Sequence, residues 1–299
     1  MARKPVKPRR ATSAAKKSTK TATKTARPAP KAPARKAPAP APKRAVHQPP
    51  PPPSVKPTVI LVGADKGGVG QSTVARFLLD FLGQNRIRAR AFDTEAPRGT
   101  LYHFHPDETT IVDLRSTADQ MRIFDTLMSS PERVSVIDVR AGGLTPVLAT
   151  LEEIGFFDAV KAGEFGFILL HVLGPSISSL DEIDVVAPYV NDADYFIVKN
   201  HVNDSTFFEW DPQTHSKYFE NVSAAGEITV PQLDAQAYEK VEIASTPFST
   251  FVADRTAEGR PAHHSFVLKG KVYSWLNRVA EAFEDVGILD LLDVGKKGR

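Results

Sequence analysis

The sequence predicts an α/β protein with a mostly parallel, doubly wound sheet, preceded by a basic tail that does not fold. Three observations support this prediction. Near the start of the body, an apolar strand-like run leads directly into a glycine-rich loop and a helix-like segment. Strand-like and helix-like segments then alternate, which is typical of a parallel sheet with helices on both faces. Basic residues and prolines are concentrated in the first 54 of the 299 residues.

Residues 1–54 differ from the rest of the chain in charge and composition. They hold 15 of the 38 lysine and arginine residues, 13 of the 24 prolines, and no acidic or aromatic residue. Such a segment buries too little apolar surface to offset the entropy of ordering its backbone, so we expect disorder. The prolines at positions 49–53 predict a stiff polyproline II spacer. Residues 55–299 are expected to fold as one domain, which is acidic because it has 23 basic and 35 acidic side chains.

The composition of the whole chain excludes several classes of protein. Cysteine is absent, which excludes disulfide scaffolds, thiolate nucleophiles and cysteine-based metal sites. The longest apolar runs are far shorter than the ~20 residues that a membrane-spanning helix needs. A body of about 245 residues can bury a core as a single α/β domain. We therefore expect a cytoplasmic protein.

The tail offers positive charge without aromatic side chains. Spaced lysine and arginine suit contact with phosphates, whereas stacking on bases requires aromatic residues. We expect non-specific, salt-dependent contact with nucleic acid, and association with the nucleoid if that nucleic acid is DNA. Two alternatives stay open. The tail could serve only solubility, or it could contact an anionic membrane surface, which is the weaker alternative because no apolar anchor accompanies the charge.

The body begins with a strand, a glycine loop and a helix in direct succession. Residues 58–64 are β-branched and aliphatic, as in a strand that is buried on both faces. The loop reads Asp65-Lys-Gly-Gly-Val-Gly-Gln-Ser-Thr73, and residues 74–82 carry apolar side chains at helical spacing. Backbone N–H groups of such a loop wrap phosphates, and the helix N-terminus adds its dipole. The sequence therefore predicts a phosphate-binding loop, with the Ser72 hydroxyl placed to ligate Mg²⁺.

The motif KGGVGxST after a buried strand resembles the deviant Walker A loop of the ParA/MinD family of P-loop ATPases. The resemblance covers about residues 57–285 and implies that ATP and Mg²⁺ bind at the loop. The residues implied are Gly67, Gly68, Val69, Gly70, Gln71, Ser72 and Thr73. Lys66 matches the family's catalytic lysine, which reaches across a homodimer to the partner's phosphates. Gln71 departs from the family, which has a second lysine there. Because glutamine supplies no charge, ATP hydrolysis stays open.

Two further strands end in carboxylates, as in this family. Residues 88–93 end at Asp93 and lead into Asp93-Thr-Glu-Ala-Pro97, which resembles the switch segment whose first aspartate orients the attacking water. The resemblance thus implies a catalytic role for Asp93. Residues 133–138 end at Asp138, which matches the Walker B aspartate and would hold Mg²⁺ together with Ser72.

Later segments continue the alternation of strands and helices. The expected elements are strands at 166–173 and 194–200 and a helix at 177–186. The family places a base-reading asparagine just after such a strand, which implies that role for Asn200. Residues 227–233 resemble the family's late strand and proline loop that border the base, which adds Pro231 to the cofactor-binding residues.

Other segments have ordinary structural interpretations. We expect His171 to be a satisfied core residue and His263-His264 to be a solvated helix start. The aromatic segment 207–210 suits packing of an insertion or an exposed contact. Residues 272–286 predict a packed amphipathic helix. Residues 288–294 faintly resemble a membrane-targeting helix, but their two aspartates favour packing.

The leading hypothesis for function is an ATP-dependent, dimerising switch. It would position or partition DNA or a cellular machine, with an unidentified protein partner and a tail that contacts nucleic acid. A second hypothesis, motivated by Gln71, is a scaffold that keeps the fold without hydrolysing ATP, for example an accessory to conjugation or polysaccharide secretion. A third is a nucleic-acid-compacting protein that acts through its tail.

Overall fold

The computed structural model describes residues 56–209, 212–219, 224 and 226–292. By its contacts the chain divides into two units, Met1–Pro50 and Pro51–Arg299, and the description concerns the second. The predicted tail, residues 1–54, lies outside the described residues, as do Trp210 and residues 293–299.

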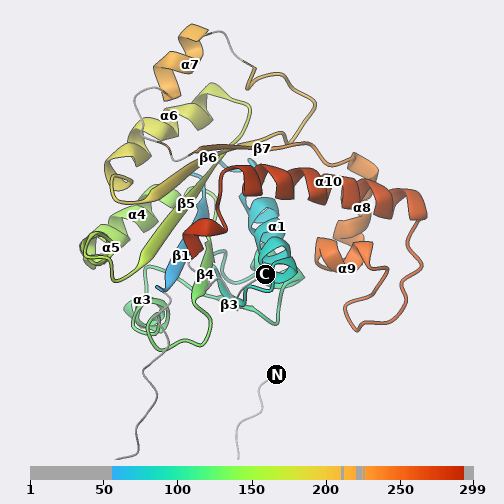
Figure 1. The fold of residues 1–299 in the computed structure, drawn as a ribbon, viewed down its shortest axis with the longest axis horizontal. Coiled ribbons are helices and arrows are strands. Elements are labelled where there is room, and N and C mark those ends of the chain that lie inside the picture. The colour runs from blue at the N-terminus through green and yellow to red at the C-terminus, as the bar shows by residue number, and fades with distance from the viewer. Residues whose placement is uncertain (1–55, 210–211, 220–223, 225, 293–299) are drawn as a thin grey trace, which may run out of the picture. The chain divides into compact units, whose positions relative to one another are not determined.

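One parallel sheet of seven strands forms the centre of the second unit (Figure 1). The strands are β1 (Thr58–Gly63), β2 (Ala89–Asp93), β3 (Thr109–Ile111), β4 (Val134–Asp138), β5 (Gly166–Leu173), β6 (Asp194–Asn200) and β7 (Gly226–Val230). Their order is β3-β2-β4-β1-β5-β6-β7, and every pairing is parallel, so the predicted fold class is confirmed. β1 lies in the middle and is buried throughout, which is why its sequence is continuously apolar.

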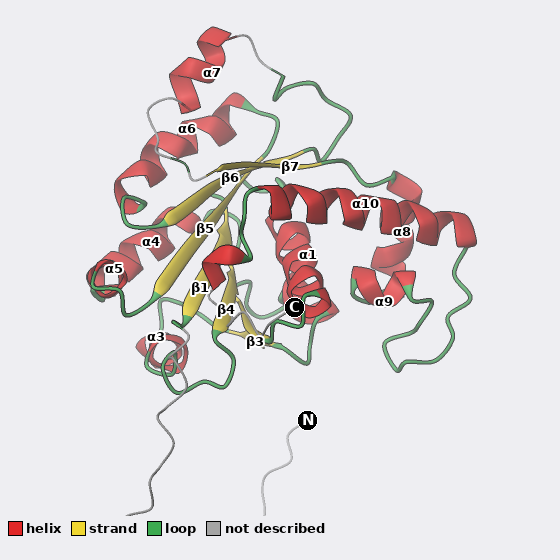
Figure 2. Ribbon diagram, viewed as in Figure 1, coloured by secondary structure: helices red, strands yellow, loops and turns green. Residues whose placement is uncertain are grey.

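Helices cover both faces of the sheet (Figure 2). Ile60 and Val62 belong to one apolar core, and Val59 and Leu61 belong to the other, because successive side chains of a strand point to opposite faces. The first core includes α1 (Gln71–Gln84), α8 (Ala235–Ala244), α9 (Phe248–Val252) and α10 (Phe266–Asp285). The second includes α3 (Thr117–Phe124), α4 (Leu144–Glu153), α5 (Phe156–Lys161), α6 (Ile177–Val186) and α7 (Pro212–Phe219). The sheet is therefore doubly wound, as predicted.

Several boundaries match the prediction and others move for identifiable reasons. β5, β6 and α6 have the predicted bounds. α1 begins at Gln71, three residues before the first apolar helical position. α10 begins at Phe266, before the predicted start at 272. Its first turn is exposed and carries no apolar periodicity, so the sequence pattern does not indicate this start. Ser265 marks this start by accepting a 3.5 Å hydrogen bond from the backbone N–H of Leu268.

The aromatic and C-terminal segments pack against the body. Phe207 and Phe208 lie against the second core, which supports the packing interpretation of this insertion. Ile288 and Leu292 are each 1% exposed and belong to the first core, so packing also holds at the C-terminal end. His264 is half-buried and stacks on Phe251, which corrects the solvated position expected for it. Among the described residues, no helix has the length and apolarity needed to cross a membrane.

Candidate functional site

The glycine loop joins the end of β1 to the start of α1. Gly68 and Gly70 have φ values of 77° and 83°, in the left-handed region that glycine adopts readily. No side chain caps the first turn of α1, and that turn carries no acidic residue. The backbone N–H groups at this helix start therefore keep their partial positive charge, which suits an anion.

The loop is held closely by Asn200 at the end of strand β6. Asn200 is buried, and its amide nitrogen donates a 2.7 Å hydrogen bond to the carbonyl oxygen of Val69. A Cβ at Gly70 would collide with that amide nitrogen, whereas a Cβ at Gly68 would meet no atom within 4 Å. Gly70 is thus required by packing, and Gly68 leaves its side of the loop open to a ligand.

The predicted loop residues differ in exposure. Lys66 is exposed, Ser72 and Thr73 are half-buried, and Gln71 is 7% exposed. Val69 is buried, and a Cβ at Gly174 would lie 2.7 Å from its side chain, so Val69 anchors the loop to the core. Only the backbone of Val69 can therefore serve a phosphate.

Asp93 and Asp138 lie side by side at the carboxyl ends of β2 and β4, where they are paired in register. Asp138 is 2% exposed, and within the described structure its Oδ1 atom has no hydrogen-bond partner. Burial raises the pKa of Asp138 well above its usual value, and the charge of the nearby Asp93 adds to this rise. A hydrogen bond from the Ser72 side chain opposes it. A desolvated carboxylate with a free oxygen beside a hydroxyl is a donor set that fits Mg²⁺.

Asp93 also has a structural role, because it binds the backbone at the start of α2 (Thr100–Phe104). Its Oδ1 accepts a 2.9 Å hydrogen bond from the N–H of Glu95, and its Oδ2 accepts a 3.0 Å bond from the N–H of Tyr102. Burial raises the pKa of Asp93, and these backbone hydrogen bonds oppose the rise. Its predicted water-orienting role stays a prediction.

A buried polar chain that the sequence did not reveal braces the other end of the loop. Glu182 accepts a 2.8 Å hydrogen bond from the N–H of Asp65 and lies 3.3 Å from Nε2 of His171. Nδ1 of His171 in turn lies 2.9 Å from the Tyr195 hydroxyl, so His171 is a satisfied core residue, as predicted. The Asp65 carboxylate accepts hydrogen bonds from the backbone and hydroxyl of Thr145 in α4. Glu182 is one of three acidic residues in α6, and nothing in the sequence distinguishes it from Asp181 and Asp184, so its contact with the loop was not predictable.

A cavity of about 460 Å³ opens beside the loop on the side of β6 and β7. Asn200 and Pro231, both predicted to border a base, lie in its wall together with Gly70 and Thr73. Trp275 of α10 also lines it and donates a 2.6 Å hydrogen bond to the Pro231 carbonyl oxygen. The structure thus brings Asn200 and Pro231, the two residues predicted to border a base, to one cavity next to the glycine loop.

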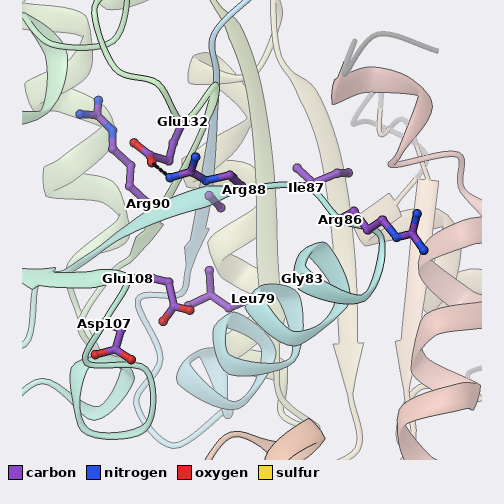
Figure 3. Close-up of a pocket in the computed structure, with 10 residues that line it drawn as sticks. Leu79, Gly83, Arg86, Ile87, Arg88, Arg90, Asp107, Glu108 and Glu132 are labelled. Atoms are coloured by element: carbon purple, nitrogen blue, oxygen red, sulfur yellow. Dashed lines mark hydrogen bonds and ion pairs between the residues drawn. The ribbon is translucent and has the colours of Figure 1, made fainter. Parts of the chain in front are cut away.

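A second cavity, of about 660 Å³, lies at the amino-terminal ends of β2 and β4, away from the ends that carry Asp93 and Asp138 (Figure 3). Arg88 and Arg90 line it, but both are engaged. Arg88 pairs with Glu132 at 2.9 Å, and Arg90 hydrogen bonds to Ser135, Thr126 and the Ile123 carbonyl oxygen. The Glu132 carboxylate offsets the charge of Arg88, and the N–H groups of Arg90 that form these bonds are not available to a ligand. Across the described residues, no cluster of three or more histidine, aspartate or glutamate side chains could hold a metal ion.

Comparison with known proteins returned solved structures alone. No family model and no curated protein matches this chain. The septum site-determining protein MinD of Pyrococcus horikoshii, complexed with Mg-ADP, is 15% identical over 78% of this chain and 98% of that chain, with a TM-score of 0.48. MinD of Aquifex aeolicus is 12% identical over 74% and 97%, with a TM-score of 0.45. A ParA family ATPase of Chlorobium tepidum is 14% identical over 75% and 99%, with a TM-score of 0.44. These structures are similar to this chain in fold.

Proposed function

We propose that this protein is a nucleotide-operated switch that binds ATP with Mg²⁺ at the glycine loop. One observation carries the proposal: the buried Asp138 carboxylate, with an unpartnered oxygen, lies beside Ser72 at the start of an uncapped helix. Two desolvated carboxylates in register raise each other's cost of ionisation, and a divalent cation would relieve that cost.

Each part of the site has a separate task. The N–H groups of the loop and of the first turn of α1 bind the phosphates. Ser72 and Asp138 hold Mg²⁺, which when bound supplies positive charge to the phosphate oxygens. Asp93 orients a water for attack, and the exposed Lys66 contacts the nucleotide of a second copy. Asn200 and Pro231 border the base in the cavity of about 460 Å³.

Calorimetry with ATP and ADP, with and without Mg²⁺, tests the proposal. We expect micromolar, Mg²⁺-dependent ATP binding by the wild type, and tighter binding by Gln71→Lys because a charge is added at the helix start. The chain has two tryptophans. In a Trp210→Phe background the emission therefore reports Trp275, which lines the base cavity, and we expect ATP to change it. Absence of ATP binding by both the wild type and Gln71→Lys would overturn the proposal.

Dimerisation is the step that would make the site a switch. Light scattering should then give a dimer with ATP and a monomer with ADP, and Lys66→Ala should remain monomeric with ATP. A wild type that stays monomeric with bound ATP would leave a nucleotide-binding protein but remove the dimeric switch.

A second candidate is a scaffold that binds nucleotide without hydrolysing it. Gln71 favours this candidate, since a buried neutral amide stands at the first residue of α1. Phosphate release by the wild type that needs Mg²⁺ and disappears in Asp93→Ala would exclude the scaffold. The protein partner, the contact of the tail with nucleic acid and the expected cytoplasmic or nucleoid location remain parts of the proposal.

A further inference from the structure

With Gln71, the glycine loop has one positive charge fewer near the phosphates of a triphosphate ligand than a loop with lysine at that position. The N–H groups of the loop provide only partial positive charges. The full charge of the loop is that of Lys66, whose side chain is exposed. The terminal phosphates of ATP carry most of its negative charge, so a second full charge near them has a large effect on affinity.

The order of the strands fixes where the terminal phosphates would lie. Relative to β1, the base cavity lies on the side of β6 and β7, and the carboxylates Asp93 and Asp138 lie on the side of β2 and β4. A nucleotide with its base in that cavity and its phosphates on the loop therefore directs its terminal phosphates towards β2 and β4. A charge that replaces the missing lysine should come from this side.

The loop that follows Asp138 lies against the glycine loop on this side. A Cβ at Gly67 would lie 3.5 Å from Cβ of Ala141, and a Cβ at Gly142 would lie 3.9 Å from the carbonyl oxygen of Asp65. Gly142 has φ 72°, so the tight return of this loop depends on glycine.

Arg140 is the cation carried by this loop. Its backbone N–H donates a 2.8 Å hydrogen bond to the hydroxyl of Thr94, which directly follows Asp93. Its exposed side chain lines a small cavity of about 90 Å³ that Thr94 and Ala96 also line. Among the described residues no carboxylate forms an ion pair with its guanidinium, whereas the neighbouring Arg115 binds Asp113 through two hydrogen bonds of 3.0 and 2.9 Å.

We propose that Arg140 binds the terminal phosphates of ATP and supplies the charge that Gln71 lacks. This inference rests on the proposed nucleotide site and names a further phosphate-binding residue in it. The long side chain swings from the small cavity to the adjacent loop, where a bidentate guanidinium–phosphate contact replaces the single ammonium contact of a lysine. ADP, which lacks the last phosphate, depends on Arg140 less than ATP does.

Calorimetry of the full chain with Mg-ATP and Mg-ADP tests the proposal. Arg140→Gln should weaken ATP binding about ten-fold or more and ADP binding about three-fold or less. Arg140→Lys should lose less ATP affinity than Arg140→Gln, because it keeps the charge but not the bidentate contact. Asp113→Asn with Arg115→Gln is the matched control, since it removes the ion pair from the same small cavity without freeing a carboxylate that Arg140 could bind, and it should leave both affinities unchanged. Adding Gln71→Lys to Arg140→Gln should restore ATP binding.

The outcomes separate this inference from the proposed function. If the wild type and Gln71→Lys both fail to bind ATP, the proposed function falls and Arg140 falls with it. If the wild type binds ATP and Arg140→Gln binds it equally well, only the role of Arg140 is overturned. An equal loss in Arg140→Gln and in the control would mean that any change in the small cavity weakens binding, and would also overturn it. Urea unfolding of each variant shows whether a loss reflects a destabilised fold.

Discussion

Asp80 shows how the burial of one side chain makes stability depend on pH. It lies in α1, accepts hydrogen bonds from the backbone and hydroxyl of Ser249, and is 6% exposed. Burial raises its pKa from 3.8 to about 6. Between these values the folded protein binds more protons at Asp80 than the unfolded chain does, so this residue lowers the free energy of unfolding as pH rises. Burial lowers the pKa of His105 from 6.5 to about 4, and the nearby Arg76 adds to this change. His105 therefore has the opposite effect and increases the free energy of unfolding as pH rises between these values.

Asp80→Asn should therefore change the pH profile of stability. Relative to the wild type, the free energy of unfolding of this variant should increase by about 2 kcal/mol between pH 4 and pH 7, because the variant loses the falling contribution of Asp80, whereas both proteins keep the rising contribution of His105. Urea unfolding at pH 4, 5, 6 and 7 measures this. Parallel profiles for the two proteins would show that Asp80 titrates as an exposed carboxyl does.

Gly70 and Gly68 form a matched pair for testing how the loop is held. Both have positive φ, so alanine at either position carries a similar backbone cost of about 1–2 kcal/mol. Only Gly70→Ala also displaces Asn200 and its hydrogen bond to Val69. We expect Gly70→Ala to be less stable than Gly68→Ala by about 1 kcal/mol or more, measured by urea unfolding without ligand. Equal losses would mean that Asn200 does not brace the loop.

At the scale of elements, one buried arginine joins four helices. Arg76 of α1 is 1% exposed and pairs with Glu242 of α8 at 2.6 Å. Its guanidinium carbon lies 3.3 Å from the ring centroid of Phe104 in α2 and 4.5 Å from that of Phe248 in α9. Its Nε and Nη2 atoms have no hydrogen-bond partner among the described residues. Since Asp93 holds the start of α2, this cluster connects the strand-end carboxylates to α8 and α9.

The two sides of this ion pair should respond differently to substitution. Glu242→Gln leaves a buried charge without its counter-ion and should lower the free energy of unfolding by about 2 kcal/mol, a value reduced by the partial exposure of Glu242. Arg76→Met removes the charge, fills a similar volume and contacts both rings, so it should change stability by less than about 1 kcal/mol. Urea unfolding of both variants tests the asymmetry, and a larger loss in Arg76→Met would contradict it.

Elements with a long apolar signal were predictable, and short or polar ones were not. The strands at 166–173 and 194–200 were predicted with their observed bounds because parallel strands buried on both faces read as continuous apolar runs. β3 has three residues, two of them only half-buried, and α2 has five, so neither forms a periodic pattern. The same limit applies to the candidate site. The glycine loop and strand-end carboxylates were predictable as local motifs, whereas Glu182 and Arg140 become relevant only when distant segments meet.

At the scale of the whole molecule, charge is divided between the tail and the body. The full chain has a formal net charge of +3, and because residues 1–54 contribute 15 positive charges and no negative ones, the remainder is at −12. An acidic body repels nucleic acid, so any affinity for DNA has to come from the tail. Such affinity depends steeply on salt, since every phosphate that is neutralised releases counterions.

Deleting residues 1–54 should therefore abolish DNA retention, while the deleted chain keeps the same unfolding midpoint because both apolar cores lie within the described residues of the body. For the full chain, we expect the logarithm of the DNA affinity to fall linearly with the logarithm of the salt concentration, with a slope of roughly −0.9 for each phosphate contact. Fluorescence anisotropy with two duplexes of unrelated sequence measures the slope, and both should give the same value. Retention of DNA by the deleted chain at low salt would place the contact on the body and remove the assigned role of the tail.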